Sequence, residues 1–261
     1  MRGNGNFVDQ MGRTVVLETI ARRVLSIVPS QTELLFYLGL EDKIVGLTKF
    51  CVHPTSARRE KVVVGGTKNL HLDKIVALKP DLVIGNKEEN TQELIHHLSQ
   101  ICPIWMSDIH SLTSAQEMIA EMGNFFDVES KSQRLIDELR DEFDSFQKLN
   151  KLRVLYFIWR DPYMVAGSGT FIDHMLNTIG LENAAFNLSR YPLLEIDEIR
   201  SLAPEVIMLS SEPYPFKTKH IAELEKEFPD TQIMIVNGEY FSWYGSRLLK
   251  APAYFKTLNF V

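Results

Sequence analysis

The fold of this chain is indicated by a helix–strand segment that occurs twice. Its first copy reads LDKIVALKPDLVI over residues 72–84, and its second reads IDEIRSLAPEVIM over residues 196–208. In each copy a short helical pattern stops before a proline, and an apolar run typical of a buried strand follows the proline. Because such an internal repeat is the signature of a duplicated architecture, we expect two similar lobes.

Strands and helices alternate outward from both copies. A β-branched run at 24–28 stops at Pro29. Ser30 and Glu33 then form the pattern of a capping box for a helix that Gly39 ends. Further strands are predicted at residues 43–47, 81–85, 103–106, 153–158, 205–208 and 232–236, and further helices at 72–78, 91–99 and 171–178. This alternation predicts an α/β protein with parallel sheets in both lobes.

Residues 128–149 have a different pattern. Apolar side chains recur there at helical spacing, with charges between them and no Gly or Pro; they are Leu135, Leu139, Phe143 and Phe146. The pattern predicts one amphipathic helix of about 22 residues, roughly 33 Å long. The expected organisation is an N-terminal extension (1–23), which the resemblance described below makes a hairpin, then a Rossmann-like lobe (24–125), a long rigid connecting helix (126–150) and a second Rossmann-like lobe (151–261).

The composition is that of an ordinary globular protein. Of its 261 residues 45% are hydrophobic and 24% charged, so the chain can bury a sizeable core. Its 28 basic and 34 acidic residues give a net charge of −6, which argues against nucleic acid as a partner. No stretch approaches the roughly 20 apolar residues of a membrane span. The N-terminal residues lack the apolar core of a signal peptide, so we expect no export signal on the chain as written.

Motifs of common enzyme classes are missing from the sequence. It contains no HExxH, no GxSxG, no P-loop and no GxGxxG, which leaves hydrolase, NTPase and dinucleotide-binding functions without a motif. The seven histidines are not spaced as zinc ligands, so no resident metal site is predicted. These enzyme classes and a resident metal site therefore have no support from sequence motifs.

Three segments together carry a family resemblance. VLSIVPSQTE at 24–33 and IVALKPDLVI at 75–84 resemble two segments of the cobalamin- and iron-chelate-binding proteins that feed ABC importers. Residues 7–17 are similar to the short N-terminal hairpin of many members of that family. Together with the connecting helix, the resemblance covers almost the whole chain in order.

The resemblance implies a function. It implies two lobes that close on a small-molecule ligand and delivery of that ligand to a dimeric ABC permease without chemistry on it, so that the protein is a binding protein and not an enzyme. It also implies a periplasmic or cell-envelope location. Ligand sites form preferentially where domains meet, which agrees with this arrangement. The ligand would be a metal chelate, either cobalamin or another corrinoid or a ferric siderophore. It would be cargo and not a cofactor, and we expect the protein to be a monomer.

Loops at the carboxyl ends of strands supply the ligand contacts of an α/β lobe. After the strand at 43–47 come Phe50, Cys51 and His53, whose imidazole suits a metal or a corrinoid cobalt. On the alternative interpretation Phe50 packs, His53 is solvated and Cys51 is a small buried hydrophobe.

Two further loops of the first lobe are candidates. The glycine pair at 65–66 permits close backbone approach before Thr67 and Lys68. By the resemblance, cobalamin-binding members carry tryptophan where this chain has Thr67. Lys87 follows the next predicted strand among mixed charges, which suit either a polar head group of the ligand or a solvated helix start.

The second lobe offers two aromatic–arginine clusters at loop positions. Aromatic rings supply flat apolar surface, and Arg supplies a planar fork for carboxylate or phosphate. The alternative is that such rings are lids of the core. By the resemblance, Tyr240 stands at the family's second tryptophan position. The two clusters are Trp159, Arg160 and Tyr163, and Tyr240, Trp243 and Arg247.

Asp73 and Asp197 occupy the same place in the two repeat copies, seven residues before the proline. By themselves they are acids favoured near a helix N-terminus. In the resembling family an acid at this place in each lobe, usually glutamate, pairs with arginines of the permease dimer, and a two-fold partner would meet two such acids symmetrically. Asp73 and Asp197 are therefore predicted to dock the permease, with Glu198 as an alternative in the second lobe.

Two other functions stay open on the sequence. One is a direct receptor for Zn or Mn ions with the same architecture. The other is a small cytosolic enzyme on a duplicated α/β fold, suggested by the missing export signal and by Cys51 near His53. The sequence also leaves open which ligand binds (cobalamin, siderophore, haem or bare metal) and whether Cys51 and Cys102 form a disulfide.

Overall fold

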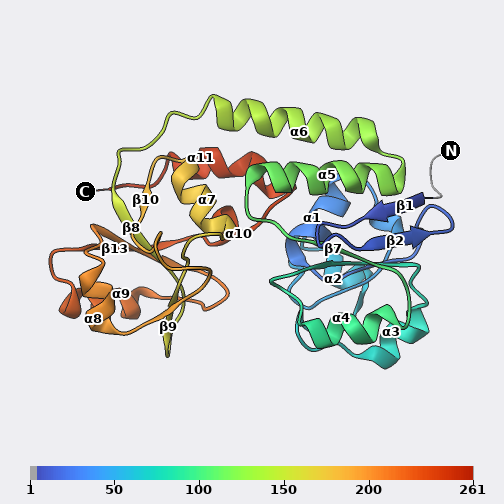
Figure 1. The fold of residues 1–261 in the computed structure, drawn as a ribbon, viewed down its shortest axis with the longest axis horizontal. Coiled ribbons are helices and arrows are strands. Elements are labelled where there is room, and N and C mark those ends of the chain that lie inside the picture. The colour runs from blue at the N-terminus through green and yellow to red at the C-terminus, as the bar shows by residue number, and fades with distance from the viewer. Residues whose placement is uncertain (1–4, 261) are drawn as a thin grey trace. The chain divides into compact units, whose positions relative to one another are not determined.

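The computed structural model describes residues 5–260, which fold into two compact units (Figure 1). Unit 1 contains residues 5–109, 113–140 and 244–247, and unit 2 contains residues 110–112, 141–243 and 248–260. Each unit combines one main sheet with helices, which is the predicted α/β class. None of the helices within residues 5–260 combines the length and the apolar character that a membrane span requires.

The main sheet of unit 1 has five strands in the order β5-β4-β3-β6-β7, and all its neighbouring pairs are parallel. The four strands predicted in this part of the sequence are confirmed. The fifth, β5, was not predicted because it has only two residues. The strands are β3 (Val24–Ser26), β4 (Ile44–Leu47), β5 (Val62–Val63), β6 (Leu82–Asn86) and β7 (Ile104–Ser107).

The helices of unit 1 follow local signals closely. The first repeat copy forms its helix at Leu72–Leu78, as predicted, and Lys79 ends that helix in the left-handed region at φ 48° before Pro80. Gly39 ends the first helix at φ 75°. The elements are α1 (Pro29–Tyr37), the 3-10 turn η1 (Glu41–Lys43), α2 (Ala57–Glu60), α3 (Leu72–Leu78), α4 (Gln92–Ser99), α5 (Leu112–Phe126) and α6 (Glu129–Asp144), the last residues of which belong to unit 2.

The capping box predicted at Ser30 and Glu33 is wrong. α1 starts at Pro29, whose fixed φ suits the first helical position, so Val28 is the N-cap. The Glu33 carboxylate instead accepts two hydrogen bonds from the Arg247 guanidinium, at 2.9 Å and 2.8 Å. A partner 214 residues away in the chain therefore takes the carboxylate that the local pattern assigned to the cap.

The connecting helix is shorter than its apolar pattern predicts. α6 has 16 residues, which span about 24 Å and not the roughly 33 Å expected for a helix over 128–149. Beyond it Phe146 packs against Phe255, with ring centroids 6.3 Å apart, and the Leu149 N–H donates to the Ile179 carbonyl at 2.8 Å. These tertiary contacts hold the last part of the predicted helix in a non-helical conformation.

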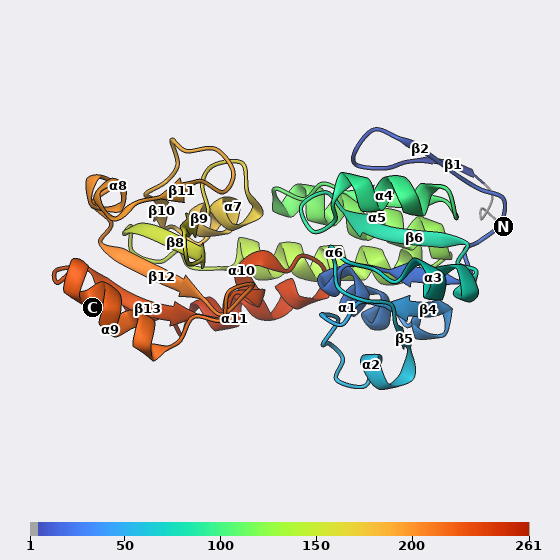
Figure 2. The same ribbon diagram turned by 90° about the horizontal axis from the view of Figure 1, so that it is seen from below.

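α5 and α6 lie side by side in both views (Figure 1 and Figure 2). A Cβ atom on Gly123 of α5 would collide with the Ser132 side chain of α6, so this close approach requires glycine. Asp127 joins the two helices in the left-handed region, at φ 55°. The apolar stripe of α6 is buried as its spacing predicts, including Leu135 and Leu139.

The sheet of unit 2 is mixed, with strand order β11-β9-β8-β12-β13 and β10 paired to β8. β8, β12 and β13 are parallel, whereas β9 returns beside β8 in the antiparallel direction because only three residues join them. The strands are β8 (Arg153–Trp159), β9 (Tyr163–Val165), β10 (Glu182–Asn183), β11 (Leu193–Leu194), β12 (Val206–Ser210) and β13 (Gln232–Val236). The helical elements are α7 (Phe171–Thr178), α8 (Ile196–Ser201), α9 (Thr218–Glu227), α10 (Glu239–Ser242), η2 (Ser246–Lys250, which begins in unit 1) and α11 (Ala251–Phe255).

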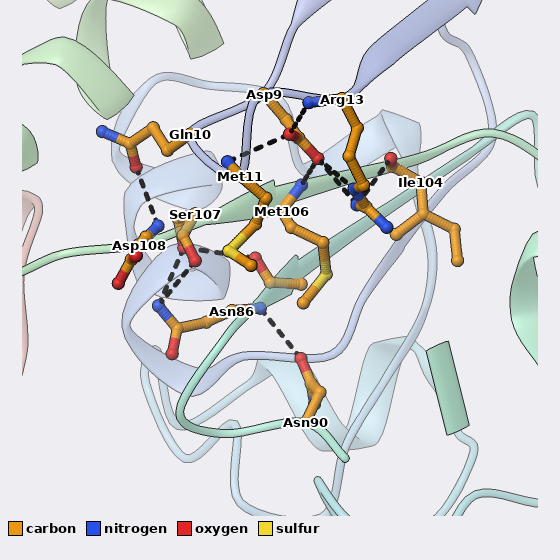
Figure 3. Close-up of polar contacts among 11 residues, drawn as sticks. Asp9, Gln10, Met11, Arg13, Asn86, Asn90, Ile104, Met106, Ser107 and Asp108 are labelled. Carbon is orange, nitrogen blue, oxygen red and sulfur yellow. Dashed lines mark hydrogen bonds and ion pairs between the residues drawn. The ribbon is translucent and has the colours of Figure 1, made fainter. Parts of the chain in front are cut away.

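The predicted N-terminal hairpin is confirmed as β1 (Gly5–Val8) paired antiparallel with β2 (Thr14–Leu17). In its turn Asp9 is only 3% exposed, and its carboxylate accepts hydrogen bonds from the Arg13 backbone N–H at 2.8 Å and the Arg13 guanidinium at 2.6 Å (Figure 3). The same carboxylate accepts the Met106 N–H of β7 at 3.3 Å. A buried charge is thus paired and joined to the sheet.

The hairpin turn covers the outer edge of β7. The Gln10 N–H donates to the Met106 carbonyl at 3.1 Å, and the Arg13 guanidinium donates to the Ile104 carbonyl at 3.4 Å. The Gln10 side chain also accepts the Asp108 N–H at 3.1 Å. Because an open strand edge can pair with another chain, these bonds both stabilise unit 1 and protect the edge of its sheet.

Replacing Asp9 with alanine should therefore destabilise the protein. Asp9→Ala leaves the buried Met106 N–H and the donors of Arg13 without their acceptor, and we expect the free energy of unfolding to fall by about 2–4 kcal/mol. Urea denaturation followed by circular dichroism measures the loss. Glu18→Ala, at an exposed position just after the hairpin, is the control, with an expected change below about 0.5 kcal/mol. Equal effects of the two substitutions would contradict a stabilising role for Asp9.

Candidate functional site

The parallel strands of unit 1 all end at one edge of its sheet, and the loops that leave them lie at that edge. We call these loops the loop rim; it comprises residues 48–53, 64–70, 86–90 and 107–108. The structure places on it all the residues that the sequence selected as ligand contacts in the first lobe: Phe50, Cys51, His53, Thr67, Lys68 and Lys87.

Hydrogen bonds join neighbouring loops of the rim. The Lys49 N–H donates to the Gly65 carbonyl at 2.7 Å, which ties the loop after β4 to the loop after β5. The buried Asn90 side chain donates to the Thr67 carbonyl at 2.9 Å, which ties the loop after β5 to the loop after β6. Buried bonds of this kind fix the backbone, because breaking one leaves a polar group unpaired.

Asn86 and Asn90 extend these ties to the ends of β6 and β7. Asn86 Nδ2 donates to Ser107 Oγ at 3.0 Å, and the Asn86 N–H donates to Asn90 Oδ1 at 2.9 Å (Figure 3). At the surface of the same loops Lys87 forms an ion pair with Asp108, at 2.6 Å. Sequence reasoning selected Lys87 and missed both asparagines; the available signal was an asparagine at the end of a predicted strand, where a short polar side chain can bond the next loop.

Phe50 is the exposed ring of the loop rim, with an exposed fraction of 49%. The Lys49 ammonium lies 5.0 Å from the centroid of that ring. A Cβ atom on Gly66 would be 3.2 Å from the ring, so glycine at this position lets Phe50 lie close to the next loop. In the same loop as Gly66, Lys68 is exposed, whereas Thr67 is buried. The rim therefore presents an aromatic ring and ammonium groups on a fixed backbone.

Cys51 lies behind this surface. Its buried thiol is 3.1 Å from Thr32 Oγ1 and 3.3 Å from Thr48 Oγ1, and burial raises the pKa of the thiol against the opposing effect of these hydrogen bonds. His53 is half-buried. Among residues 5–260 no three side chains of His, Cys, Asp or Glu gather as a metal site. Cys51 and Cys102 are both free thiols.

In unit 2 the predicted cluster after β8 contains one exposed side chain and two that are partly buried. Trp159 has an exposed fraction of 42%, and its ring meets Tyr214 edge-on at 5.6 Å. Arg160 forms an ion pair with Glu223 of α9. Tyr163 is half-buried, and burial raises the pKa of its hydroxyl. Trp159 is consequently the residue of this cluster with the most surface to offer a ligand.

The second predicted cluster is divided between the units. Tyr240 is half-buried and stacks on Tyr254, with ring centroids 4.5 Å apart. Trp243 is only 6% exposed, and its indole N–H donates to Glu212 at 2.7 Å. Arg247 belongs to unit 1, where it is buried in the ion pair with α1 described above. The structure thus shows strong protein partners for Trp243 and Arg247, and their role as ligand contacts stays a prediction.

The two aspartates of the repeat lie where their spacing predicts, in the first turns of α3 and α8. Asp73 is exposed. The Asp197 side chain is 93% exposed and forms an ion pair with Arg200 at 2.7 Å. Glu198, by contrast, accepts the Glu195 N–H at 2.7 Å and so caps its own helix. All three acids are exposed, and Asp197 and Glu198 each have a partner within their own helix segment.

Comparison with known proteins relates this geometry to one family. A family model described as periplasmic binding protein matches residues 24–231. An uncharacterized ABC transporter substrate-binding lipoprotein of Bacillus subtilis is 26% identical over 212 residues, which are 77% of this chain and 67% of that protein. A vitamin B12-binding protein of Vibrio parahaemolyticus is 27% identical over 194 residues, 72% of this chain and 70% of that protein. The structure of a periplasmic heme-binding protein of Vibrio cholerae matches with a TM-score of 0.73 at 20% identity, over 90% of this chain and 97% of that one, and so shares the fold.

The burial of the two thiols predicts slow alkylation of the native protein. Burial raises the pKa of Cys102 to about 11, so the reactive thiolate is on the order of 0.1% of that thiol at pH about 8. We expect iodoacetamide labelling of Cys102, followed by mass spectrometry, to accelerate about tenfold per pH unit between roughly pH 8 and 10. Cys51 should label only after unfolding in urea. Fast labelling of both thiols in the native protein at pH about 8 would contradict these environments.

Proposed function

Because the chain belongs to the periplasmic binding protein family, we propose that it is the substrate-binding component of an ABC importer and that its cargo is a metal chelate. The cargo is a corrinoid such as cobalamin or a ferric siderophore. The relatives described as an ABC transporter substrate-binding lipoprotein and as a vitamin B12-binding protein support this proposal. The protein delivers the chelate to a permease without transforming it.

The observation that carries the proposal is an exposed aromatic ring at the carboxyl end of a strand in each unit. Phe50 follows β4 in unit 1, and Trp159 ends β8 in unit 2; their exposed fractions are 49% and 42%. Flat apolar surfaces suit a large chelate with an apolar body. The ammonium groups of Lys68 and Lys87 suit the carboxylates or phosphate at its periphery.

The buried ties of the loop rim support binding in a second way. Asn86 and Asn90 hold the loops before any ligand arrives, so little backbone order has to be gained when it binds. Affinity can then come from contacts made by the exposed side chains. We propose that the protein acts as a monomer in the cell envelope, where cargo capture precedes transport.

A binding screen tests the proposed cargo. Cyanocobalamin, hemin and a ferric siderophore such as ferrichrome are each added to the protein, with ZnCl₂ and MnCl₂ as comparisons. The true cargo class should stabilise the protein by about 2.7 kcal/mol at one hundred times its dissociation constant. Thermal unfolding and native mass spectrometry measure this. Stabilisation by the bare ions alone would favour a direct metal receptor, and conversion of the chelate would favour an enzyme.

The exposed rings should contribute directly to affinity. Phe50→Ala and Trp159→Ala are each expected to weaken chelate binding by at least tenfold, about 1.4 kcal/mol, because each removes a large contact surface. Titration calorimetry with the chelate identified in the screen measures the change.

Tyr37→Ala is the matched control for Phe50→Ala. Tyr37 has a similar exposed fraction, 47%, but lies in the last turn of α1, away from the loop rim. Its replacement should leave affinity within about twofold. If Phe50→Ala and Trp159→Ala behave like this control, the rings are surface residues and the assignment fails.

We also propose that Asp73 and Asp197 dock the permease. Their exposure at matching places in the repeat supports this role. The double variant Asp73→Arg/Asp197→Arg should abolish uptake in cells that carry the cognate permease, because a reversed charge repels a basic docking site. Chelate affinity and melting temperature of the purified variant should stay close to wild type. Asp42→Arg/Asp230→Arg, at exposed acids outside the repeat segment, is the control, and equal uptake by both double variants would refute the docking role.

A further inference from the structure

Tyr214 supports the exposed indole of Trp159. Tyr214 lies in the loop after β12, and its N–H donates to the Ile158 carbonyl at 3.3 Å, which fixes this loop beside the end of β8. Its ring meets Trp159 at 5.6 Å and Phe216 at 4.7 Å, both edge-on. The position of the Tyr214 ring therefore limits the orientations open to Trp159.

His220 in turn holds Tyr214. The imidazole is 2% exposed, and its Nδ1 accepts the Lys217 N–H at 2.8 Å. A nitrogen that accepts a hydrogen bond carries no proton, so the proton of the neutral ring sits on Nε2. Nε2 lies 3.4 Å from the Tyr214 hydroxyl and so donates to it. A single tautomer of His220 thus makes both hydrogen bonds: it caps the start of α9 and it holds Tyr214.

A second proton on His220 is incompatible with this arrangement. It would turn Nδ1 into a donor that faces the donor N–H of Lys217. The charged groups around the ring are Arg160 after β8, Lys217 before α9, and Lys219 and Glu223 on α9. Burial lowers the pKa of His220 below its ordinary value of 6.5, and the positive charges lower it further against the opposing effect of Glu223.

We propose that Tyr214 and His220 are positioning residues for Trp159: neutral His220, fixed by the Lys217 N–H, holds Tyr214, and Tyr214 holds the indole in its ligand-accepting orientation. A proton on Nδ1 breaks the bond to Lys217, so the imidazole leaves its place at the start of α9 and carries Tyr214 with it through Nε2. The indole then loses its support, which weakens ligand binding. The expected change in ligand affinity rests on the proposed function, whereas the expected change in the orientation of the indole does not. The sign follows from the lowered pKa: the arrangement is complete above pH about 6.5 and is lost as pH falls through the pKa of the folded protein.

Tryptophan emission of the protein without ligand is the first test. The difference between wild type and Trp159→Phe isolates the signal of Trp159 from the buried Trp105 and Trp243. As pH falls from about 7.5 to about 5, this signal should shift to longer wavelength, with a midpoint below the ordinary histidine value of 6.5.

Three variants assign that transition. His220→Gln keeps an acceptor for the Lys217 N–H, as glutamine does in a capping box, and does not titrate, so the transition should disappear. Tyr214→Phe keeps the ring but lacks the hydroxyl, and it should also lose the transition. His174→Gln, at a half-buried histidine of the same unit, is the control and should retain it. A transition that survives in both His220→Gln and Tyr214→Phe, or none in wild type, would overturn the proposal.

Cyanocobalamin affinity is the second test. For wild type it should weaken at least threefold between pH about 7.5 and 5.5, and for His220→Gln it should stay constant. An equal loss in both proteins would overturn the coupling of His220 to the ligand. If cyanocobalamin binds at neither pH, the corrinoid form of the proposed function fails, while the emission of Trp159 without ligand still decides the positioning role.

Discussion

Parallel pairing of β3 with both β4 and β6 is the constraint on which the rest of unit 1 depends. Because parallel strands run in one direction, every loop that follows them leaves from the same edge of the sheet. The loop rim is the direct consequence of this topology. In unit 2 the parallel strands β8 and β12 end together in the same way, which brings Trp159 and Tyr214 into contact.

Buried polar groups keep these edges rigid. Asn90 in unit 1 and His220 in unit 2 are both almost fully buried, and each hydrogen-bonds a backbone or side-chain group of a neighbouring segment. Leaving a buried polar group unpaired costs more free energy than its hydrogen bond contributes when formed. Each arrangement is therefore strongly preferred over its alternatives. Apolar rings can then stay exposed on a backbone that is fixed by buried hydrogen bonds.

Local signals predicted much of the fold. The helices at 72–78 and 171–178 and the strand at 232–236 have the bounds that proline, apolar spacing and β-branched runs indicate. The predicted length of the connecting helix and the predicted capping box were wrong for a common reason. Contacts of Phe146 and of Glu33 with residues far along the chain replaced the local pattern, and no window of sequence contains those partners.

The sequence by itself determined the α/β class, the repeat, the family resemblance and the loops in which ligand contacts are sought. It placed Phe50, Cys51, Trp159 and Trp243 in one category, as side chains after strands. Only the tertiary structure decided that Phe50 and Trp159 are exposed while Cys51 and Trp243 are buried against their own partners. The physical reason is that burial and hydrogen bonding depend on which distant segments pack over a side chain, whereas strands, helices and turns depend mainly on their neighbours in the chain.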